Sequence, residues 1–387
     1  MSGALARRMA DIAPFHVMAL LARARELEAA GRSIIHMEIG EPDFPTAEPI
    51  ITAGQWALAK GCTRYTPAAG LPELRQAISR HYREQYRVEV PDQRILVTPG
   101  ASGALQLATA VWVNPGDRVL LADPGYPCNR HFVRLVEGEA VGIPVGPETG
   151  YQLTAGLVEQ YWDARTAAVL LASPANPTGT VVPPEELAAI VATVEARGGR
   201  VIMDEIYHGL VYGAALQTAL AYSDQTFVVN SLSKFYGMTG WRLGWLVAPE
   251  DSVGAAEKLA QNLFLAASTP AQHAALAAFT PEAQAIFAAR RQEFQARRDF
   301  LLPALRELGF VIPVTPDGAF YLYADCGRFT DDSYDFTLRL LDEAGVAITP
   351  GIDFGRHRAN RHVRFAYTSA ISQLAEGVER LRRALRN

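Results

Sequence analysis

The sequence predicts an α/β fold with two parts: a large domain with a mainly parallel sheet covered by helices, and a smaller α+β domain built from both chain ends. Three observations lead to this prediction. Short apolar runs alternate with helical patterns through the middle of the chain. Small or polar residues interrupt the chain where each run ends. Both ends of the chain instead combine amphipathic helices with a few extended segments.

In the middle of the chain, five apolar runs are expected to form short strands, at residues 94–98, 117–122, 167–172, 200–203 and 226–230. Amphipathic stretches lie between several of them. The stretch 183–199 has proline at its start, acids in its first turn and glycine at its end, as helices commonly do. Strands that alternate with helices indicate a mainly parallel sheet with both faces covered.

The chain ends have a different pattern. A helix is expected over 14–30, closed by Gly31, and the following stretch "IIHMEIGEPDFPT" is expected to be extended. After about residue 280 comes a long charged helix, then the strand-like segments "GAFYLYADC" and "HVRFAYT", and a final amphipathic helix. We therefore expect a large domain over 46–284 and a small domain made of 1–45 and 285–387.

Composition narrows the class of protein. The chain has 387 residues, 49% of them hydrophobic, and a formal net charge of −5, so neither nucleic acid nor an acidic membrane surface is expected as a partner. No apolar run is long enough for a membrane span, and the first residues lack the apolar core of a secretory signal. The three cysteines, Cys62, Cys128 and Cys326, are few and widely separated, which favours a reducing cytoplasm. The histidines show no pairing typical of metal sites, so no metal is expected.

Residues capable of chemistry follow the ends of the predicted strands. In open α/β sheets, ligands bind outside the carboxyl ends of the strands, so we expect these residues to share one crevice. It would contain a lysine, a carboxylate, phenols, an amide and hydroxyls. The residues concerned are Gly100, Ala101, Ser102, Gly103, Tyr126, Asn176, Asp204, Tyr207, Ser231 and Lys234.

Each of these residues also has an ordinary structural explanation. An aspartate after a strand is more often a helix cap than a ligand, "NPTG" is a good turn sequence, and a single lysine is usually solvated. The combination is more informative, because pyridoxal phosphate chemistry needs all these residue types together. It needs a lysine to form a Schiff base with the aldehyde and a carboxylate facing the pyridine nitrogen. It also needs an anion cradle for the phosphate, which helix-start N–H groups, hydroxyls and an arginine provide.

The stretch "SLSKFYGMTGWRLGW", residues 231–245, resembles the lysine motif of the class I/II aminotransferases. These are fold-type I pyridoxal-phosphate enzymes, of which aspartate aminotransferase is the best known. The resemblance extends over nearly the whole chain and keeps the family's order. It includes "IGEPDFPT", "RYTPAAGLPELR", "SPANPTG", "DEIY" and "HVRFAYT".

The resemblance implies roles around the cofactor ring. Lys234 would hold pyridoxal 5′-phosphate and later move the proton at the substrate Cα, with a lowered pKa. Asp204 would keep the pyridine nitrogen protonated. Asn176 and Tyr207 would bond the ring's 3-oxygen, and Tyr126 would stack on the ring face.

The resemblance also implies how the phosphate is held. Arg242 and Ser231 would bind it, together with the main-chain N–H groups near Ala101 and Ser102. Tyr65 would reach the phosphate of the neighbouring subunit, so a complete site would require a homodimer.

For the substrate, the resemblance assigns the α-carboxylate to Arg364, whose planar fork suits a carboxylate. Arg358 and Arg361 lie nearby in the sequence as alternatives. Gly40 would offer backbone at the substrate mouth, where the lack of a side chain permits close approach. The family resemblance further implies cis bonds at Asp123–Pro124 and Asn176–Pro177.

These roles predict a cytoplasmic, homodimeric aminotransferase that moves an amino group from an L-amino acid to a 2-oxo acid by a ping-pong route. The segment 261–272 is more apolar than expected for an aspartate enzyme, and no second cation is placed for a side-chain carboxylate, which weakens the case for aspartate. One alternative is a β-lyase or an enzyme like 1-aminocyclopropane-1-carboxylate synthase. Another is a non-catalytic regulatory protein of the same fold, against which intact Lys234, Asp204 and Arg364 count, as does the absence of a DNA-binding module near the N-terminus.

Overall fold

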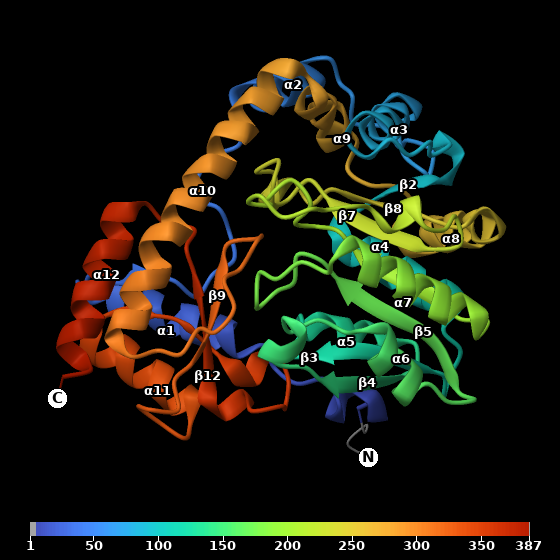
Figure 1. Cartoon of the computed structure of the whole chain (residues 1–387). Coiled ribbons are helices and arrows are strands. Elements are labelled where there is room, and N and C mark those ends of the chain that lie inside the picture. Colours follow the sequence, from blue (N-terminus) through green and yellow to red (C-terminus); the bar gives the residue numbers. More distant parts are fainter. Residues whose placement is uncertain (1–4, 387) are drawn as a thin grey trace.

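The computed structural model describes residues 5–386, and its centre is a seven-stranded sheet with the order β2-β8-β7-β6-β5-β3-β4 (Figure 1). All neighbouring pairs from β7 to β4 are parallel, whereas β8 runs antiparallel to both β7 and β2. The strands are β2 (Ile95–Thr98), β3 (Arg118–Asp123), β4 (Glu139–Pro144), β5 (Thr166–Ala172), β6 (Arg200–Asp204), β7 (Phe227–Ser231) and β8 (Gly244–Val247). The predicted α/β fold with a mainly parallel sheet is confirmed.

The central strands of this sheet are buried on both faces. Successive side chains of a strand point to opposite faces, so alternate residues enter different cores. Val169, Leu171 and Met203 belong to one hydrophobic cluster, and Leu170 and Ile202 belong to another. This double burial explains why the five predicted strands are continuous apolar runs rather than alternating ones.

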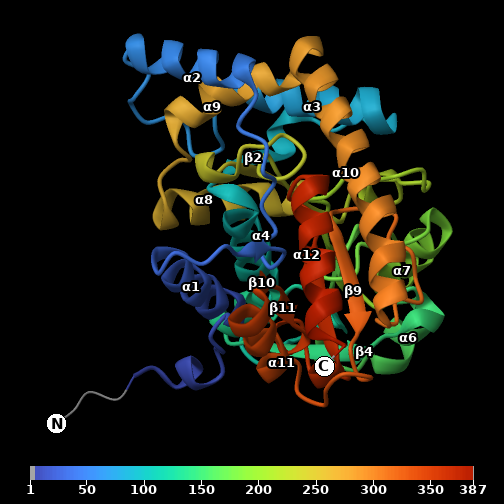
Figure 2. The same ribbon diagram turned by 90° about the vertical axis from the view of Figure 1, so that its left-hand side faces the viewer.

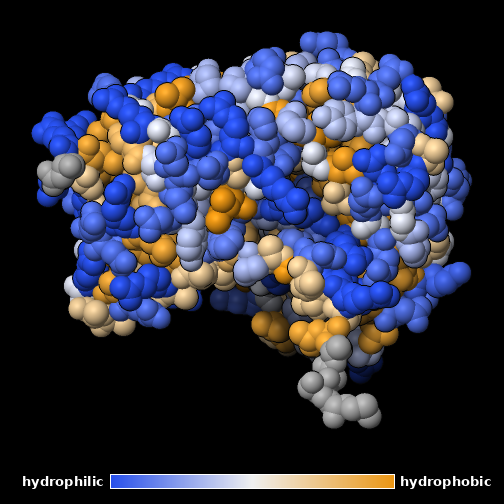
Figure 3. Space-filling model, turned by 90° about the horizontal axis from the view of Figure 1, so that it is seen from below, coloured by the Kyte–Doolittle hydropathy of each residue, from blue (hydrophilic) through white to orange (hydrophobic). Residues whose placement is uncertain are grey.

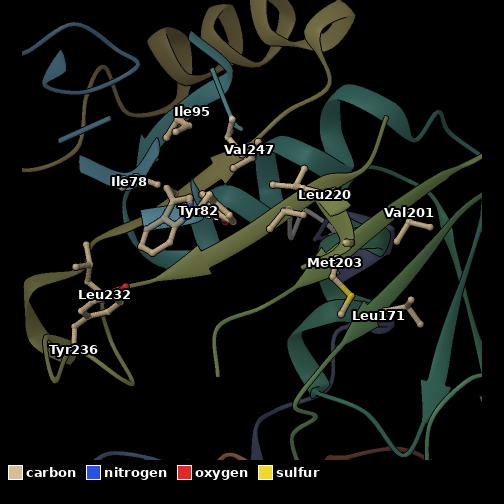
Figure 4. Close-up of a cluster of buried hydrophobic side chains, with 14 of the residues drawn as sticks. Ile78, Tyr82, Ile95, Leu171, Val201, Met203, Leu220, Leu232, Tyr236 and Val247 are labelled. Atoms are coloured by element: carbon tan, nitrogen blue, oxygen red, sulfur yellow. Dashed lines mark hydrogen bonds between the residues drawn. The ribbon is translucent and has the colours of Figure 1, made fainter. Parts of the chain in front are cut away.

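Helices cover the two faces of the sheet. The first face packs against α2 (Glu48–Ala59), α3 (Pro72–Tyr86), α6 (Ala155–Tyr161), α7 (Pro184–Ala196) and α9 (Thr269–Leu276). The second face packs against α4 (Gly100–Trp112), α5 (Pro127–Leu135) and α8 (Glu250–Leu263). Figure 4 shows part of the first core, to which α3 contributes Tyr82 and the strands contribute residues such as Val247 and Met203. The Trp245 indole N–H donates to the Tyr82 hydroxyl over 3.1 Å, so this buried pair leaves neither polar group unpaired.

Two smaller sheets lie beside the large one. β9 (Tyr321–Asp325), β12 (His362–Ala366) and β11 (Thr349–Pro350) form an antiparallel sheet in the order β11-β12-β9. β1 (Ile35–His36) pairs in parallel with β10 (Val346–Ala347). The helices α1 (His16–Ala29), α10 (Pro281–Leu308), α11 (Ser333–Arg339) and α12 (Ile371–Ala384) surround these sheets (Figure 2). Segments from both chain ends therefore lie together.

The 28-residue helix α10 connects the two regions (Figure 1). Ala283 and Phe287, near its start, belong to the core on the first face of the large sheet. Phe294 and Leu301 belong to the core of the smaller sheets. The predicted domain boundary at residue 284 falls within the first turn of this helix. The division into 46–284 and the two chain ends stays a prediction.

No helix among residues 5–386 has the length and apolar character needed to cross a bilayer. The face seen from below carries mostly hydrophilic residues with scattered hydrophobic ones (Figure 3). Within the same residues, no group of three or more His, Cys, Asp or Glu side chains is placed to hold a metal ion.

Candidate active site

A cavity of about 210 Å³ lies at the carboxyl ends of the central strands and reaches the smaller sheets. It brings together the predicted site residues except Tyr65, Gly100 and Gly103, which do not line it. Its lining includes Gly40, Ala101, Ser102, Tyr126, Asn176, Asp204, Tyr207, Ser231, Lys234, Arg242 and Arg364. The topology explains the part contributed by the large sheet, because parallel strands end at the same edge of a sheet. Gly40, after β1, and Arg364, in β12, reach the cavity from the smaller sheets.

Lys234 lies just after β7, and its side chain is largely buried. Its ammonium group donates to the backbone oxygen of Gly40 over 2.7 Å. Burial lowers the pKa of Lys234 to about 8, and the positive charges of Arg364 and Arg242 contribute in the same direction. A lysine with this pKa has a substantial unprotonated fraction near neutral pH, so it can act as a nucleophile or a base.

Asp204 ends β6 and is only 5% exposed. Its Oδ1 accepts the backbone N–H of Ile206 over 3.1 Å. Burial raises the pKa of Asp204 to about 6, while the Ile206 hydrogen bond and the charge of Lys234 act in the opposite direction. A buried carboxylate with one backbone donor still has acceptor capacity for a protonated ligand nitrogen.

An arrangement suited to an anion lies at the start of α4. The guanidinium of Arg242 approaches so closely that a Cβ added to Gly100 would lie 2.7 Å from its Nη2. Gly100 also has φ +71°, which glycine adopts without strain. Ala101 and Ser102 follow in the first helical turn, whose N–H groups have no partner within a helix. The hydroxyl of Ser231 also lines this part of the cavity.

Arg364 in β12 is 2% exposed and held from several sides. Its Nη1 donates to Asn176 Oδ1 over 2.8 Å, and its Nη2 donates to Thr349 Oγ1 over 3.1 Å and to the backbone oxygen of Glu38. The guanidinium carbon lies 4.3 Å from the ring centroid of Tyr321 and 4.9 Å from that of Phe354.

These contacts leave Arg364 Nε without a partner, although the atom is buried. An orphaned donor on a fixed, planar cation fits a carboxylate ligand. The alternatives Arg358 and Arg361 are exposed and do not line the cavity; Arg358 pairs instead with Asp325.

Sequence reasoning missed Tyr321. Its hydroxyl lies 2.7 Å from that of Tyr207, and a Cβ added to Gly40 would lie only 2.0 Å from the same oxygen. The absence of a side chain at Gly40 is therefore what admits Tyr321 to the cavity. Tyr321 lay within the predicted strand "GAFYLYADC", but no sequence signal placed it beside Tyr207.

Sequence reasoning also missed the apolar mouth of the cavity. Phe15, Val17 and Met18, at the start of α1, line it together with Ile39. The N–H groups of His16 and Val17 donate to the Asp353 carboxylate over 2.8 and 2.9 Å, and this fixes the start of the helix. The pattern of residues 14–30 predicted the helix, but it did not predict that the start of the helix bonds to Asp353 and lines the cavity.

Tyr65 lies apart from the cavity of its own chain and is 83% exposed. Other exposed apolar side chains are Trp56 and Leu58 on α2, Leu263 at the end of α8, and Leu265 between α8 and α9. The Thr269 hydroxyl, at the start of α9, donates to the backbone oxygen of Arg64 and joins the Tyr65 loop to that helix.

The two predicted cis bonds, Asp123–Pro124 and Asn176–Pro177, are both present, and Ser173–Pro174 is cis as well. The residues around the cavity fit pyridoxal 5′-phosphate. A lysine of lowered pKa, a buried carboxylate, and an arginine packed against a helix-start glycine face one space, and these match its aldehyde, pyridine nitrogen and phosphate.

The model of the family described as aminotransferase class I and II matches residues 32–381. A valine–pyruvate aminotransferase of Mycobacterium tuberculosis is 41% identical over 374 residues, 96% of each chain. A probable aspartate/prephenate aminotransferase of Thermus aquaticus is 35% identical and covers 98% of this chain and 99% of its own.

Solved structures are similar over the same length. An aminotransferase from Mycobacterium tuberculosis has a TM-score of 0.96 at 40% identity, with all of both chains covered. Aspartate aminotransferase from Thermus thermophilus with maleate has a TM-score of 0.93 at 34% identity, covering 98% of this chain and 99% of that one.

Proposed function

Because the chain belongs to the class I and II aminotransferases, we propose that its cavity binds pyridoxal 5′-phosphate and that the enzyme transfers the amino group of an apolar L-amino acid to a 2-oxo acid. Aminotransferase activity itself is common to its relatives. The observation that carries the finer proposal is the meeting of Lys234, Asp204 and Arg364 in one cavity.

The cofactor would supply an aldehyde that takes up the substrate amine and a conjugated ring that accepts the electron pair left at Cα. Asp204 would hold the ring nitrogen in its protonated form, because a buried carboxylate is stabilised by a facing positive charge. Arg242, Ser231 and the first N–H groups of α4 would bind the phosphate, while Asn176 and Tyr207 would bond the 3-oxygen. Tyr126 would cover one face of the ring.

Lys234 would carry the proton. Its lowered pKa increases the fraction of free amine, which would remove a proton from the substrate Cα and return one to the cofactor carbon. The two half-reactions use the same groups in opposite order, which gives a ping-pong sequence. Arg364 would hold the α-carboxylate in both, so that the Cα–H bond stays directed toward Lys234.

The apolar mouth of the cavity supports the proposed substrate class. Phe15, Val17 and Ile39 present apolar side chains there, and a buried apolar wall favours aliphatic or aromatic side chains over charged ones. The relative from Mycobacterium tuberculosis is named for valine and pyruvate. Both points support an apolar amino acid as donor.

The proposed assembly is a cytoplasmic homodimer. A subunit contact near α2 and the α8–α9 connection is supported by the exposed side chains of Tyr65, Trp56, Leu58, Leu263 and Leu265. Burying these side chains would remove apolar surface from water. The three cysteines are free, and this supports a reducing compartment.

A half-reaction screen tests the proposal. The purified holoenzyme is mixed with each amino acid in turn, without a 2-oxo acid, and the absorbance of the bound cofactor is followed. Valine and other apolar amino acids should convert it faster than aspartate. Release of pyruvate and ammonia from a cysteine conjugate in the absence of an acceptor would instead indicate a β-lyase.

A further inference from the structure

Two loops meet beside the active site, one from the large sheet and one from the smaller sheets. Asp123 ends β3, and its carboxylate accepts the backbone N–H of Arg356 on both oxygens, at 3.0 and 2.9 Å. The N–H of His357 donates to Oδ1 over 3.2 Å. These partners lie more than two hundred residues apart in the chain, so the contact joins segments that the sequence does not bring together.

The loop is shaped to receive this carboxylate. A Cβ added to Gly355 would lie 1.8 Å from Asp123 Oδ1, so no other residue could stand at 355 without moving one of the loops. A second bond lies alongside, because the N–H of Gly125 donates to the backbone oxygen of Phe354 over 2.8 Å. Two adjacent contacts fix both the distance and the angle between the loops.

Each loop carries a residue of the proposed site. On one side, Tyr126 follows Gly125 directly and lines the cavity. On the other side, the Phe354 ring lies 4.9 Å from the guanidinium carbon of Arg364. The preceding residue, Asp353, holds the start of α1 at the cavity mouth.

We propose that Asp123 is a positioning residue for the substrate, because its carboxylate fixes the place of Tyr126 relative to Phe354 and Arg364. The inference rests on the proposed function, in which Tyr126 covers the cofactor ring and Arg364 holds the α-carboxylate. The gap between these two groups sets where the substrate Cα lies over the ring. A displacement of about 1 Å in such a gap is sufficient to slow a reaction by about 10²-fold.

Three variants weaken the contact in different ways. Asp123→Ala removes all three N–H···O bonds. Asp123→Asn keeps the shape and one acceptor oxygen but loses the charge, and charge-assisted bonds are about twice as strong as neutral ones. Gly355→Ala leaves the carboxylate in place and separates the loops by a steric clash. Asp117→Ala is a matched control, because Asp117 accepts the Asn114 N–H over 2.8 Å at the opposite end of β3, far from the cavity.

The experiment measures cofactor content, kcat and KM in both half-reactions, and the thermal midpoint of each holoenzyme. We expect kcat/KM for the amino acid and for the 2-oxo acid to fall by about tenfold or more in Asp123→Ala and Gly355→Ala, mainly through kcat, because a displaced Cα reacts more slowly. We expect Asp123→Asn to recover much of this loss. Cofactor content should be unchanged, because the phosphate and lysine contacts lie on other elements. Asp117→Ala should lower the midpoint at most and leave kcat/KM as it is.

Unchanged kcat/KM in Asp123→Ala or Gly355→Ala would overturn the inference, as would an equal fall in Asp117→Ala. If Asp123→Ala does not fold, Asp123→Asn and Gly355→Ala decide the question. Arg364→Lys separates this result from a failure of the proposed function. If that variant leaves kcat/KM unchanged, Arg364 does not hold the substrate; if it lowers kcat/KM while the Asp123 variants do not, only the positioning role is wrong.

Discussion

Arg364 Nη1 donates to Asn176 Oδ1 over 2.8 Å, and this bond joins β12 to the turn after β5. The two residues come from different sheets and have different proposed ligands, the substrate carboxylate and the ring's 3-oxygen. Because they share a hydrogen bond, the position of either one depends on the other. The substrate and cofactor contacts therefore form one connected network, and the variants below disturb it at separate points.

Lys234 is expected to carry the covalent link to the cofactor. Borohydride reduction followed by peptide mapping should find the modified residue at Lys234; modification at Lys60 or Lys258 would contradict the assignment. Lys234→Ala should still bind cofactor through the phosphate contacts. Its turnover should fall by about 10²–10⁴-fold or more, the usual contribution of a positioned acid–base group.

Asp204→Asn keeps the shape of the side chain and removes its charge. We expect kcat to fall by about 10²–10³-fold, the range found when one preorganised electrostatic group is lost. The absorbance of the bound cofactor should shift, since the ring nitrogen loses its ionic partner. Turnover equal to that of the wild type would show that Asp204 only supports the fold.

Arg364 should affect all amino-acid substrates alike, because they share the α-carboxylate. Arg364→Lys keeps the charge and loses the planar fork, whereas Arg364→Ala loses both. We expect kcat/KM to fall by a similar factor for every substrate. For the alanine variant, this fall corresponds to a loss of transition-state stabilisation on the order of 2–5 kcal/mol. If only aspartate and glutamate were affected, Arg364 would read the substrate side chain.

Tyr65 is expected to act in the site of a partner subunit. A chain carrying Lys234→Ala and a chain carrying Tyr65→Ala with a second cross-subunit change are each expected to be inactive. Mixed and reassembled, they should recover part of the activity through one intact site per heterodimer. If heterodimers form and stay inactive, each site is built from a single chain.

His36 should make stability depend on pH. Its ring bonds to Glu38 Oε1 over 2.7 Å and to Glu28 Oε1 over 3.1 Å, and the Glu38 bond is the main cause that raises the pKa of His36 from 6.5 to about 9. Between these values the folded protein retains a proton that the unfolded chain has lost. The stabilisation is therefore complete below pH 6.5 and is lost as the pH rises to about 9.

His36→Gln should remove the pH-dependent stabilisation that His36 contributes. As the pH rises from 6.5 to about 9, the thermal midpoint of the wild type should fall more steeply than that of the variant. Other buried groups titrate in both proteins, so the difference between the two curves is the quantity that reports on His36. Parallel curves would contradict the role given to the Glu38 pair.

The elements that sequence reasoning identified and missed differ in a physical way. The run 167–172 is apolar throughout because β5 is buried on both faces. β4 was missed, since it lies at the sheet edge, is largely exposed and contains Gly142 and Pro144, which are poor strand formers. The short β8 was missed because its first two residues, Gly244 and Trp245, are also the last two residues of the lysine motif.

The site shows the same division. Asp204 and Lys234 could be predicted, because strand ends of one parallel sheet must converge. Arg364 was found only through the family resemblance. Tyr321, which lines the cavity, and Phe354 and Asp353, which contact Arg364 and the start of α1 beside it, were missed. They are placed by the packing of distant segments, for which a single sequence carries no periodic signal.

The length of α10 has a consequence for motion. At 28 residues it is about 42 Å long, and one end is anchored beneath the large sheet while the other packs under the smaller ones. From Phe287 to the end of the helix is about 31 Å, so a rotation of about 5° at Phe287 displaces that end by about 3 Å. Pro303 removes one backbone donor from the far end, so bending is easiest there. A movement of the smaller sheets relative to the large one would therefore act on α10 near Phe287, where the helix joins the core of the large sheet, or near Pro303.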